Sequence, residues 1–448
     1  MIKQISKRVG STKGKSALKI AMPDTNNHHI QVNSNDTGDD CRIKTDSSKD
    51  GSSSTPTISL IAQQLGKGNE EILSPKLFMN EQINILPYKR HLEICKTDFK
   101  VGRILGKGSF GVIHEGEVYN LRYTGSKTTV AIKSINGQAT LDMATFFLGE
   151  IKIMSNLELH CNLVNMLGSC TSNLKVDGNA WLIMEYCNEK DLLQFLIKNR
   201  NQFKKVFKTD KREAPNNTTE MIHVRSILTI AFDIAKGMDY LASKRIMHGD
   251  LAARNILLSS NNACKNRLHA KIADFGLSKV MANKSYYRKQ TRNYVPWKWM
   301  AFEFLDDGIF KMKSDVWSFG VVIWELFSLG NEPYNQEEYQ DVLEKLNNGY
   351  YLQCPEEVDR IQSWPAKEIY NNLAKMCFVK KEFDRSSFSD IIRYLALKLS
   401  NNELIQYESL RSSYLNHECR QPYFTFNVSS NISLTTYQLK SRHLNILN

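Results

Sequence analysis

Residues 246–257 read Ile246-Met-His248-Gly249-Asp250-Leu-Ala-Ala-Arg254-Asn255-Ile256-Leu257, and residues 273–276 read Ala273-Asp274-Phe275-Gly276. Short apolar runs beside both stretches place Asp250, Asn255 and Asp274 on loops next to short strands. Phosphoryl transfer needs such a set of oxygen atoms: one carboxylate accepts the hydroxyl proton, while an amide and a second carboxylate hold Mg²⁺ against a triphosphate. Any one of the three could be a solvated loop residue. Their occurrence together with the motifs below favours the catalytic interpretation.

A glycine-rich stretch lies upstream, with the sequence Gly106-Lys107-Gly108-Ser109-Phe110-Gly111. This GxGxxG pattern is weak evidence by itself, because a dinucleotide-binding Rossmann turn shares it. A Rossmann turn continues directly into a helix, whereas residues 112–119 have the character of a strand. We therefore predict a β-hairpin whose glycines let backbone N–H groups approach phosphates.

A lysine and a glutamate follow this hairpin. Lys133 ends the β-branched run Val130-Ala131-Ile132-Lys133, and a buried lysine must find an anion. Glu150 lies on a predicted helix with an inward-facing apolar side. By itself Glu150 would be read as a surface carboxylate, but paired with Lys133 it would aim the lysine amine at a nucleotide.

The composition restricts the class of protein. The chain has 448 residues, of which 42% are hydrophobic and 24% charged, values of ordinary globular proteins. Its net charge of +12 suits phosphate or acidic peptides, and the absence of a base-reading motif argues against nucleic-acid binding. Nine cysteines without a CxxC pair predict reduced thiols. We find no long apolar run or signal peptide, and Ile2 stands where myristoylation requires glycine, so a soluble chain is expected.

These motifs resemble the signature set of protein kinases, and specifically of receptor tyrosine kinases. Asp250-Leu-Ala-Ala-Arg254-Asn255 and Pro296-Trp-Lys298-Trp299-Met300 resemble the catalytic loop and the substrate groove of tyrosine kinases. Three further stretches are similar to the fibroblast, vascular endothelial and platelet-derived growth factor receptors: Leu86-Pro-Tyr88, residues 162–171 and residues 235–243. The resemblance covers roughly residues 86–399. It implies an α+β, two-lobed kinase fold, with a small β-rich N-lobe containing one key helix and a larger α-helical C-lobe.

We predict the following organisation: a disordered polar segment at 1–80, a juxtamembrane-like segment at 81–98, the kinase domain at 99–399 and a polar C-terminal tail at 400–448. Within the domain we expect an N-lobe at 99–184, a hinge at 185–190 and a C-lobe at 191–399 with a short insert at 201–222.

The resemblance also implies residue roles. The expected catalytic residues are Asp250 as base, Lys133 with Glu150, and Arg254 near the transferred phosphate; Asn255 and Asp274 are expected to hold Mg²⁺. ATP is the expected co-substrate. Its binding residues are expected to be Leu105, Gly106, Lys107, Gly108, Ser109, Phe110, Gly111, Val112, Ile113, Ala131, Lys133, the gatekeeper Met184, the hinge residues Glu185, Tyr186 and Cys187, and Leu257. Related receptors autophosphorylate paired activation-loop tyrosines, here Tyr286 and Tyr287.

Other positions have supporting roles. Asp315 should tie down the catalytic loop, and Glu303 should pair with Arg385. His248, Phe275, Met154 and Met166 should stack between the lobes, although for the two methionines simple core filling fits equally well.

The sequence departs from the family pattern at three notable positions. Gly249 replaces an arginine that links the catalytic loop to the phosphorylated activation loop. Phe302 replaces a proline, and Lys190 replaces a glycine at the end of the hinge. We therefore expect a protein tyrosine kinase, with a catalytically silent scaffold as the alternative. The implied partners are protein tyrosines, a second copy for trans-autophosphorylation and SH2-domain adaptors, the last through Tyr414-Leu-Asn416. The implied location is the cytoplasmic side, at the membrane if the chain is part of a receptor.

Overall fold

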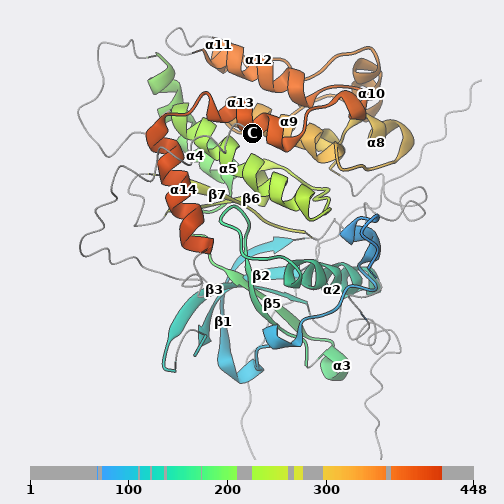
Figure 1. Ribbon diagram of the computed structural model, residues 1–448, viewed down its shortest axis with the longest axis vertical. Coiled ribbons are helices and arrows are strands. Elements are labelled where there is room, and N and C mark those ends of the chain that lie inside the picture. Colours follow the sequence, from blue (N-terminus) through green and yellow to red (C-terminus); the bar gives the residue numbers. More distant parts are fainter. Residues whose placement is uncertain are drawn as a thin grey trace, which may run out of the picture. The chain divides into compact units, whose positions relative to one another are not determined.

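The structure is a computed structural model that describes residues 68, 73–108, 111–121, 124–135, 139–172, 174–208, 224–260, 267–275, 296–359 and 365–415. All of these positions fall within one structural unit, residues 53–448. Figure 1 shows a β-sheet with helix α2 beside it, and a separate group of helices that includes α8 to α13.

The five strands form an antiparallel sheet in the order β1-β2-β3-β5-β4. They are β1 (Phe99–Gly108), β2 (Gly111–Tyr119), β3 (Lys127–Ile135), β4 (Met166–Cys170) and β5 (Ala180–Glu185). Side chains alternate between the faces of a strand, so Val130 and Ile132 pack into a small core on one face. Ala131 and Lys133 therefore point to the opposite face, where they are also buried.

Helix α2 (Leu141–Ser155) carries Glu150. Its first turn is capped by Thr140, whose hydroxyl accepts a hydrogen bond from the backbone N–H of Met143 at 3.2 Å. Phe147 and Ile151 are fully buried in the large core. Since Glu150 lies between these two positions on the helix, packing of the apolar face fixes where its carboxylate points.

The helical part is built around α9 (Ser314–Phe327), in which every residue except Trp324 is buried. A helix buried on all sides forms the centre of a core. The surrounding helices are α4 (Leu192–Lys208), α5 (Val224–Ser243), α8 (Phe302–Asp307), α10 (Tyr339–Asn347), α11 (Glu356–Asp359), α12 (Ala366–Cys377) and α13 (Phe388–Ala396). The short helix α3 (Leu174–Asp177) connects β4 to β5 and lies beside the sheet instead. A two-stranded hairpin, β6 (Ile256–Ser260) and β7 (Leu268–Ile272), packs against α5.

Residues upstream of β1 also join the large core. Ile83 and Leu86 are 3% and 1% exposed and pack in the same cluster as α2 and α9. The side chain of Asn80 pairs with the backbone of Met247, donating to its carbonyl at 2.9 Å and accepting from its N–H at 2.8 Å. The segment 79–87 thus contacts the residue that precedes His248.

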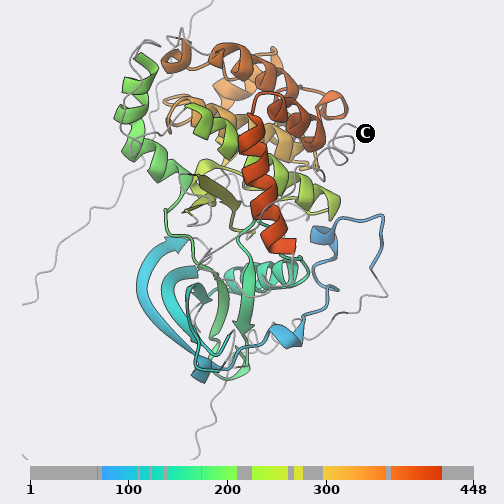
Figure 2. The ribbon, with the colours of Figure 1, turned by 60° about the vertical axis from the view of Figure 1, so that its left-hand side comes forward.

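Residues 401–415, which sequence analysis assigned to the polar tail, form helix α14 (Asn401–Leu415). Tyr407 and Leu410 on this helix are buried. Figure 2 shows α14, in red, extending from the helical part toward the five-stranded sheet. The composition of the segment is polar because only a narrow stripe of the helix is covered. Part of the predicted insert, residues 201–208, continues α4, and residues 209–222 lie outside the described residues.

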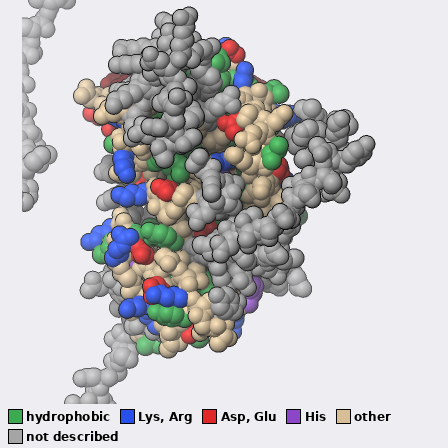
Figure 3. Space-filling view, turned by 90° about the vertical axis from the view of Figure 1, so that its left-hand side faces the viewer, with side chains coloured by type: hydrophobic (Ala, Val, Ile, Leu, Met, Phe, Trp, Pro, Cys, Tyr) green, Lys and Arg blue, Asp and Glu red, His purple; other side chains and the backbone are tan. Residues whose placement is uncertain are grey.

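The predicted α+β, two-lobed kinase fold is confirmed. Across the described ranges, no helix is both long and apolar enough to cross a membrane. On the face drawn in Figure 3, Lys and Arg side chains lie among acidic and hydrophobic ones.

Candidate active site

The loop that begins at His248 holds Asp250 in a network of polar contacts. Asn255 donates from its side-chain nitrogen to the Asp250 carboxylate at 2.8 Å and to the Asp250 backbone carbonyl at 2.7 Å. Arg254 forms an ion pair with the other carboxylate oxygen. The three side chains meet because a 3₁₀ turn, Ala253–Asn255, folds the loop back on itself.

Two buried carboxylates hold the backbone of this loop. Asp315, at the start of α9, accepts hydrogen bonds from the N–H groups of His248 at 2.8 Å and Gly249 at 3.0 Å. Glu325, nearly three turns further along α9, accepts from the N–H of Ala253 at 2.9 Å. The expected role of Asp315 agrees with these contacts. Glu325 was not expected, although a glutamate inside the apolar run 319–329 was a visible signal.

Burial raises the pKa values of the acids around this loop. The pKa of Asp250 is raised to about 6, because loss of solvent outweighs the opposing effect of the Arg254 guanidinium. Burial also raises the pKa of Asp315 and that of Glu325 to about 7, against the backbone hydrogen bonds that both accept. A base with a pKa near the working pH is suited to accepting a proton.

Gly249 adopts a left-handed backbone conformation, with φ of +78°. Residues with a β-carbon are strained by roughly 1–2 kcal/mol in that region. Glycine therefore satisfies the local geometry at the position where the family has arginine, while the N–H of Gly249 still bonds to Asp315.

Lys133 lies at the centre of the site. Its amine nitrogen is 2.7 Å from Oε2 of Glu150 and 3.1 Å from Oδ1 of Asp274. The lysine and Glu150 side chains are almost completely buried, whereas that of Asp274 is 38% exposed. Burial by itself would lower the pKa of Lys133, but the carboxylates of Asp274 and Glu150 outweigh it and the pKa is raised. The amine is therefore held as a cation beside the loop that carries Asp274.

Asp274 and Asn255 are the pair expected to hold a metal ion. Asp274 has φ of +64°, an uncommon conformation for a residue with a side chain. The segments carrying the two residues meet where the N–H of Ala273 bonds to the carbonyl of Asn255 at 2.9 Å. Asn255 uses its side-chain nitrogen for Asp250, so its oxygen is the atom that it can offer to a cation. Carboxylate and amide oxygens are ligands that hard divalent cations prefer.

The glycine-rich stretch forms the predicted hairpin. Gly108 lies opposite Gly111 at the end of the β1–β2 ladder. Gly111 has φ of +151°, and a β-carbon there would lie 2.7 Å from the carbonyl oxygen of Ser134. Only glycine lets β2 approach β3 this closely, which places Ile113 directly opposite Lys133.

The residues expected around adenine come from five strands, β1, β2, β3, β5 and β6. Ala131 pairs with Met184, and Met184 also pairs with Met166, so the expected gatekeeper lies between β3 and β4. Leu105 on β1 is 40% exposed, and Leu257 on β6 is partly buried. Glu185 ends β5, and its backbone N–H bonds to the carbonyl of Asn165 at 3.0 Å.

Of the four side chains expected to stack between the lobes, His248 and Phe275 are in direct contact. The rings of His248 and Phe275 lie 5.4 Å apart. Met154 and Met166 are buried in the same core cluster as Phe275. His248 Nε2 lies 3.1 Å from the carbonyl of Ala273, which links the two loops that carry Asp250 and Asp274.

The expected ion pair of the C-lobe is also present. Both guanidinium NH groups of Arg385 bond to the Glu303 carboxylate, each at 3.0 Å. The neighbouring Phe302 is 9% exposed, and the amine of Lys380 lies 4.4 Å from its ring centroid. The phenylalanine that replaces proline is therefore accommodated at the first position of α8.

Some expected residues lie outside the described ranges. These are Ser109 and Phe110 at the tip of the hairpin, Gly276, and the tyrosines Tyr286 and Tyr287. In the substrate-groove motif, the indole N–H of Trp299 donates to Glu325 at 3.0 Å, and its ring lies 4.5 Å from the guanidinium carbon of Arg254. Trp299 thus connects this motif to the catalytic loop.

A family model described as protein tyrosine and serine/threonine kinase matches residues 99–395. The chain belongs to this kinase family. It is 32% identical to a fibroblast growth factor receptor of Ciona intestinalis, over 79% of this chain and 46% of that relative. It is 31% identical to vascular endothelial growth factor receptor 3 of Danio rerio, over 73% of this chain and 25% of the relative. It is 34% identical to the angiopoietin-1 receptor of Danio rerio, over 68% of this chain and 25% of that relative.

The resemblance to receptor tyrosine kinases is thus confirmed, as is the prediction of a protein tyrosine kinase domain. Membership of this kinase family implies ATP as co-substrate and a divalent metal ion. The kinase spans less than half the length of each of these relatives.

Proposed function

We propose that this chain transfers the γ-phosphate of Mg-ATP to tyrosine hydroxyls of proteins. The observation that carries the proposal is the position of Lys133, whose amine contacts Glu150 and Asp274 at the same time. One cation thereby connects helix α2, strand β3 and the loop after β7. Kinase catalysis requires both the lysine–glutamate pair and the metal-binding aspartate in place.

The side chains of the loop at 248–255 have different roles in phosphoryl transfer. Asp250 accepts the proton of the incoming phenol, for which its raised pKa is suitable. Arg254, held beside Asp250, adds positive charge where the transition state gathers negative charge. Asp315 and Glu325 fix the loop backbone, so that little reorganisation is needed during reaction.

Asn255 and Asp274 would hold Mg²⁺. The ion would neutralise charge on the phosphates of the nucleotide when bound. Within the described residues no group of three or more His, Cys, Asp and Glu side chains is placed to hold a metal. An ion held by two protein oxygens fits Mg²⁺, which usually keeps water and phosphate oxygens among its ligands.

The nucleotide would lie between the glycine-rich hairpin and the segment 185–187. Residues 106–111 would offer backbone N–H groups to the phosphates. Leu105, Val112, Ile113, Ala131 and Leu257 would contact adenine, with Met184 behind it and the backbone of Glu185, Tyr186 and Cys187 beside it. Val112 and Ile113 lie opposite Ser134 and Lys133, which places both next to the catalytic lysine.

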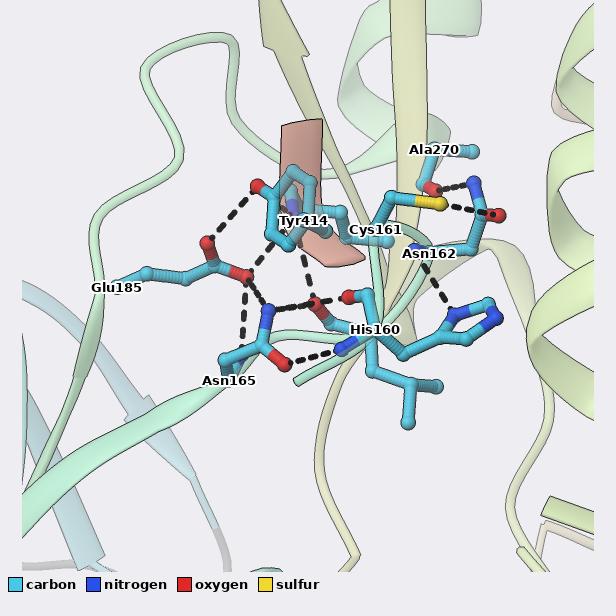
Figure 4. A network of polar contacts seen from close by, with 9 residues as sticks. His160, Cys161, Asn162, Asn165, Glu185, Ala270 and Tyr414 are labelled. Atoms are coloured by element: carbon cyan, nitrogen blue, oxygen red, sulfur yellow. Dashed lines mark hydrogen bonds and ion pairs between the residues drawn. The ribbon is translucent and has the colours of Figure 1, made fainter. Parts of the chain in front are cut away.

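The substrates and partners that we propose are those expected of a receptor-like tyrosine kinase. We propose that two copies phosphorylate Tyr286 and Tyr287 of each other. We also propose that SH2-domain adaptors bind at Tyr414-Leu-Asn416 once Tyr414 is phosphorylated, which requires that its hydroxyl leave Lys271 and Glu185 (Figure 4). We further propose a location on the cytoplasmic side of a membrane. These proposals are supported by the relatives, which are named as receptors.

The test is incubation of the purified full chain with Mg-ATP, followed by phosphotyrosine mapping. Lys133→Met and Asp250→Asn should each reduce tyrosine phosphorylation by at least about 100-fold. The exposed lysine variant Lys198→Met is the matched control and should retain activity. Circular dichroism checks that all three remain folded. A folded wild type that incorporates no phosphate would contradict the proposal and favour the scaffold alternative.

A further inference from the structure

Trp299 is fixed on helix α9 by two hydrogen bonds. Its indole N–H donates to Oε2 of Glu325 at 3.0 Å, and its backbone carbonyl accepts from the hydroxyl of Ser318 at 2.8 Å. Ser318 and Glu325 are about two helical turns apart, so they lie on the same face of α9. Both are buried, with 2% and 1% of their surface exposed. Because α9 forms the centre of the helical core, the indole ring has little freedom to move.

The indole ring of Trp299 lies against the guanidinium group of Arg254. The ring centroid is 4.5 Å from the guanidinium carbon, within the range of a cation–π contact. The same guanidinium group forms the ion pair with Asp250. An arginine side chain has many rotamers, and that of Arg254 is 35% exposed, so the ion pair alone would leave it several conformations. The ring restricts the guanidinium group to the conformations that keep it beside Asp250.

One oxygen of Glu325 positions both the ring and the loop that carries Arg254. Oε2 of Glu325 accepts from the backbone N–H of Ala253 at 2.9 Å as well as from the indole of Trp299. Ala253 immediately precedes Arg254 in the chain. The backbone at the base of the arginine and the ring that covers its guanidinium group are therefore held from the same point on α9.

We propose that Trp299 is a positioning residue for phosphoryl transfer, which acts by holding the guanidinium group of Arg254 beside Asp250. The inference rests on the proposed kinase function, in which Arg254 adds positive charge where the transition state gathers negative charge. Charge that must be aimed at a reacting group loses its effect when it is displaced by even a short distance. Loss of the ring should therefore slow transfer without weakening nucleotide binding.

Loss of the ring should also change the proton affinity of the base. Burial and the carboxylate of Asp274 raise the pKa of Asp250, and the guanidinium charge of Arg254 opposes them. When Arg254 turns away into solvent, its opposing effect weakens and the pKa of Asp250 rises further. A base must be deprotonated to accept a proton, so the acidic limb of the pH–rate profile should move to higher pH.

The test compares Trp299→Leu with the wild type in the full chain. Phosphorylation of a tyrosine-containing peptide gives kcat and KM over a range of pH, and calorimetry gives Kd for Mg-ADP. We expect kcat to fall about five- to thirtyfold and its acidic limb to move to higher pH, with Kd for Mg-ADP unchanged within about twofold. Trp299→Phe keeps a ring beside Arg254 and should lose less. Trp324→Leu removes an indole of the same helix α9, whose N–H bonds to the carbonyl of Gln353, and is the matched control that should leave kcat unchanged.

A double-mutant cycle separates action through Arg254 from a direct contact with the substrate. Arg254→Lys keeps the positive charge but removes the planar group that lies on the ring. In the Arg254→Lys background, Trp299→Leu should lower kcat by less than about twofold, because the contact is already lost. Losses in kcat that multiply in the double variant would overturn the inference. A rise in KM for the peptide at unchanged kcat in Trp299→Leu would overturn it as well.

A second cycle does not depend on catalysis. The losses in free energy of unfolding caused by Trp299→Leu and Arg254→Met, measured by urea denaturation, should be smaller together than their sum. Losses that simply add would overturn the proposed hold of Trp299 on Arg254. A folded wild type that transfers no phosphate would count against the proposed function, while the unfolding cycle would still decide whether the ring holds the guanidinium group.

Discussion

The guanidinium group of Arg385 meets the carboxylate of Glu303 through two parallel hydrogen bonds of 3.0 Å. Arg385 is 1% exposed and also donates to the backbone carbonyl of Val379 at 2.8 Å. The two bonds to Glu303 join the start of α8 to the segment between α12 and α13, in which both Arg385 and Val379 lie. Removing it would leave a buried carboxylate without its cation.

Arg385→Met should therefore destabilise the fold strongly. We expect a loss of about 3–5 kcal/mol in the free energy of unfolding, measured by urea denaturation, because the charge of Glu303 would be uncompensated. Arg393→Met breaks a largely exposed ion pair with Asp390 and should cost less than about 1 kcal/mol. Equal losses in the two variants would contradict this account of the buried pair.

Lys190→Gly should stabilise the kinase. Lys190 has φ of +64°, so its side chain is strained by roughly 1–2 kcal/mol, and glycine recovers that cost less its own loss of roughly 0.5–1 kcal/mol in backbone entropy. The net gain should be up to about 1.5 kcal/mol, visible as a higher Tm. Lys198→Gly, at an exposed position inside α4, should have the opposite sign and lose about 1 kcal/mol. A lower Tm in Lys190→Gly would show that the side chain contributes more than the strain removes.

The stability of the fold should fall as pH rises from about 4.5 to 7. Burial raises the pKa of Glu325 from 4.5 to about 7, so in this window the folded chain keeps a proton that the unfolded chain has released. Stability from this group is complete below the unfolded pKa and is lost as pH rises through the folded pKa. Glu325→Gln should remove about 1–3 kcal/mol of this pH dependence in denaturation curves. If the substitution leaves the slope of unfolding free energy against pH unchanged, the effect comes from other groups. Asp315 is one such group, because burial raises its pKa as well.

Tyr414 should remain unphosphorylated while α14 is in place, because its hydroxyl is engaged with Lys271 and Glu185. In Leu410→Asp, a buried apolar side chain is replaced by a charge, α14 should detach, and Tyr414 should become phosphorylated in the presence of Mg-ATP. Ile405→Asp changes an exposed position of the same helix and is the control. Mass spectrometry after incubation measures both. Rapid phosphorylation of Tyr414 in the wild type would show that the helix does not protect it.

The residues of the proposed catalytic centre could be selected from the sequence because they stand in short motifs. Asp250, Asn255 and Asp274 lie in two fixed stretches, and Lys133 stands at the end of a readable strand. The pairing of Lys133 with Glu150 needed the family resemblance, since nothing local distinguishes Glu150 from a surface acid.

The cluster at the end of β5 could not be predicted in the same way. Glu185 and Lys271 are separated by 86 positions, and Lys271 and Tyr414 by 143. No periodic pattern connects residues so far apart, and α14 covers only a narrow stripe of its surface, which leaves its composition tail-like. Asn80 was missed for a similar reason, because a single asparagine that pairs with backbone atoms has no motif.

The pairing of Asn80 with Met247 also bears on how this kinase would be isolated for biochemistry. A recombinant fragment cut to residues 99–395 would lack Ile83 and Leu86, and would expose the apolar residues of the core cluster to which they belong. The same fragment would lack Tyr407 and Leu410. Purification of such a fragment should give aggregation that a fragment from 73 to 415 avoids, because the shorter one presents two uncovered hydrophobic surfaces to solvent.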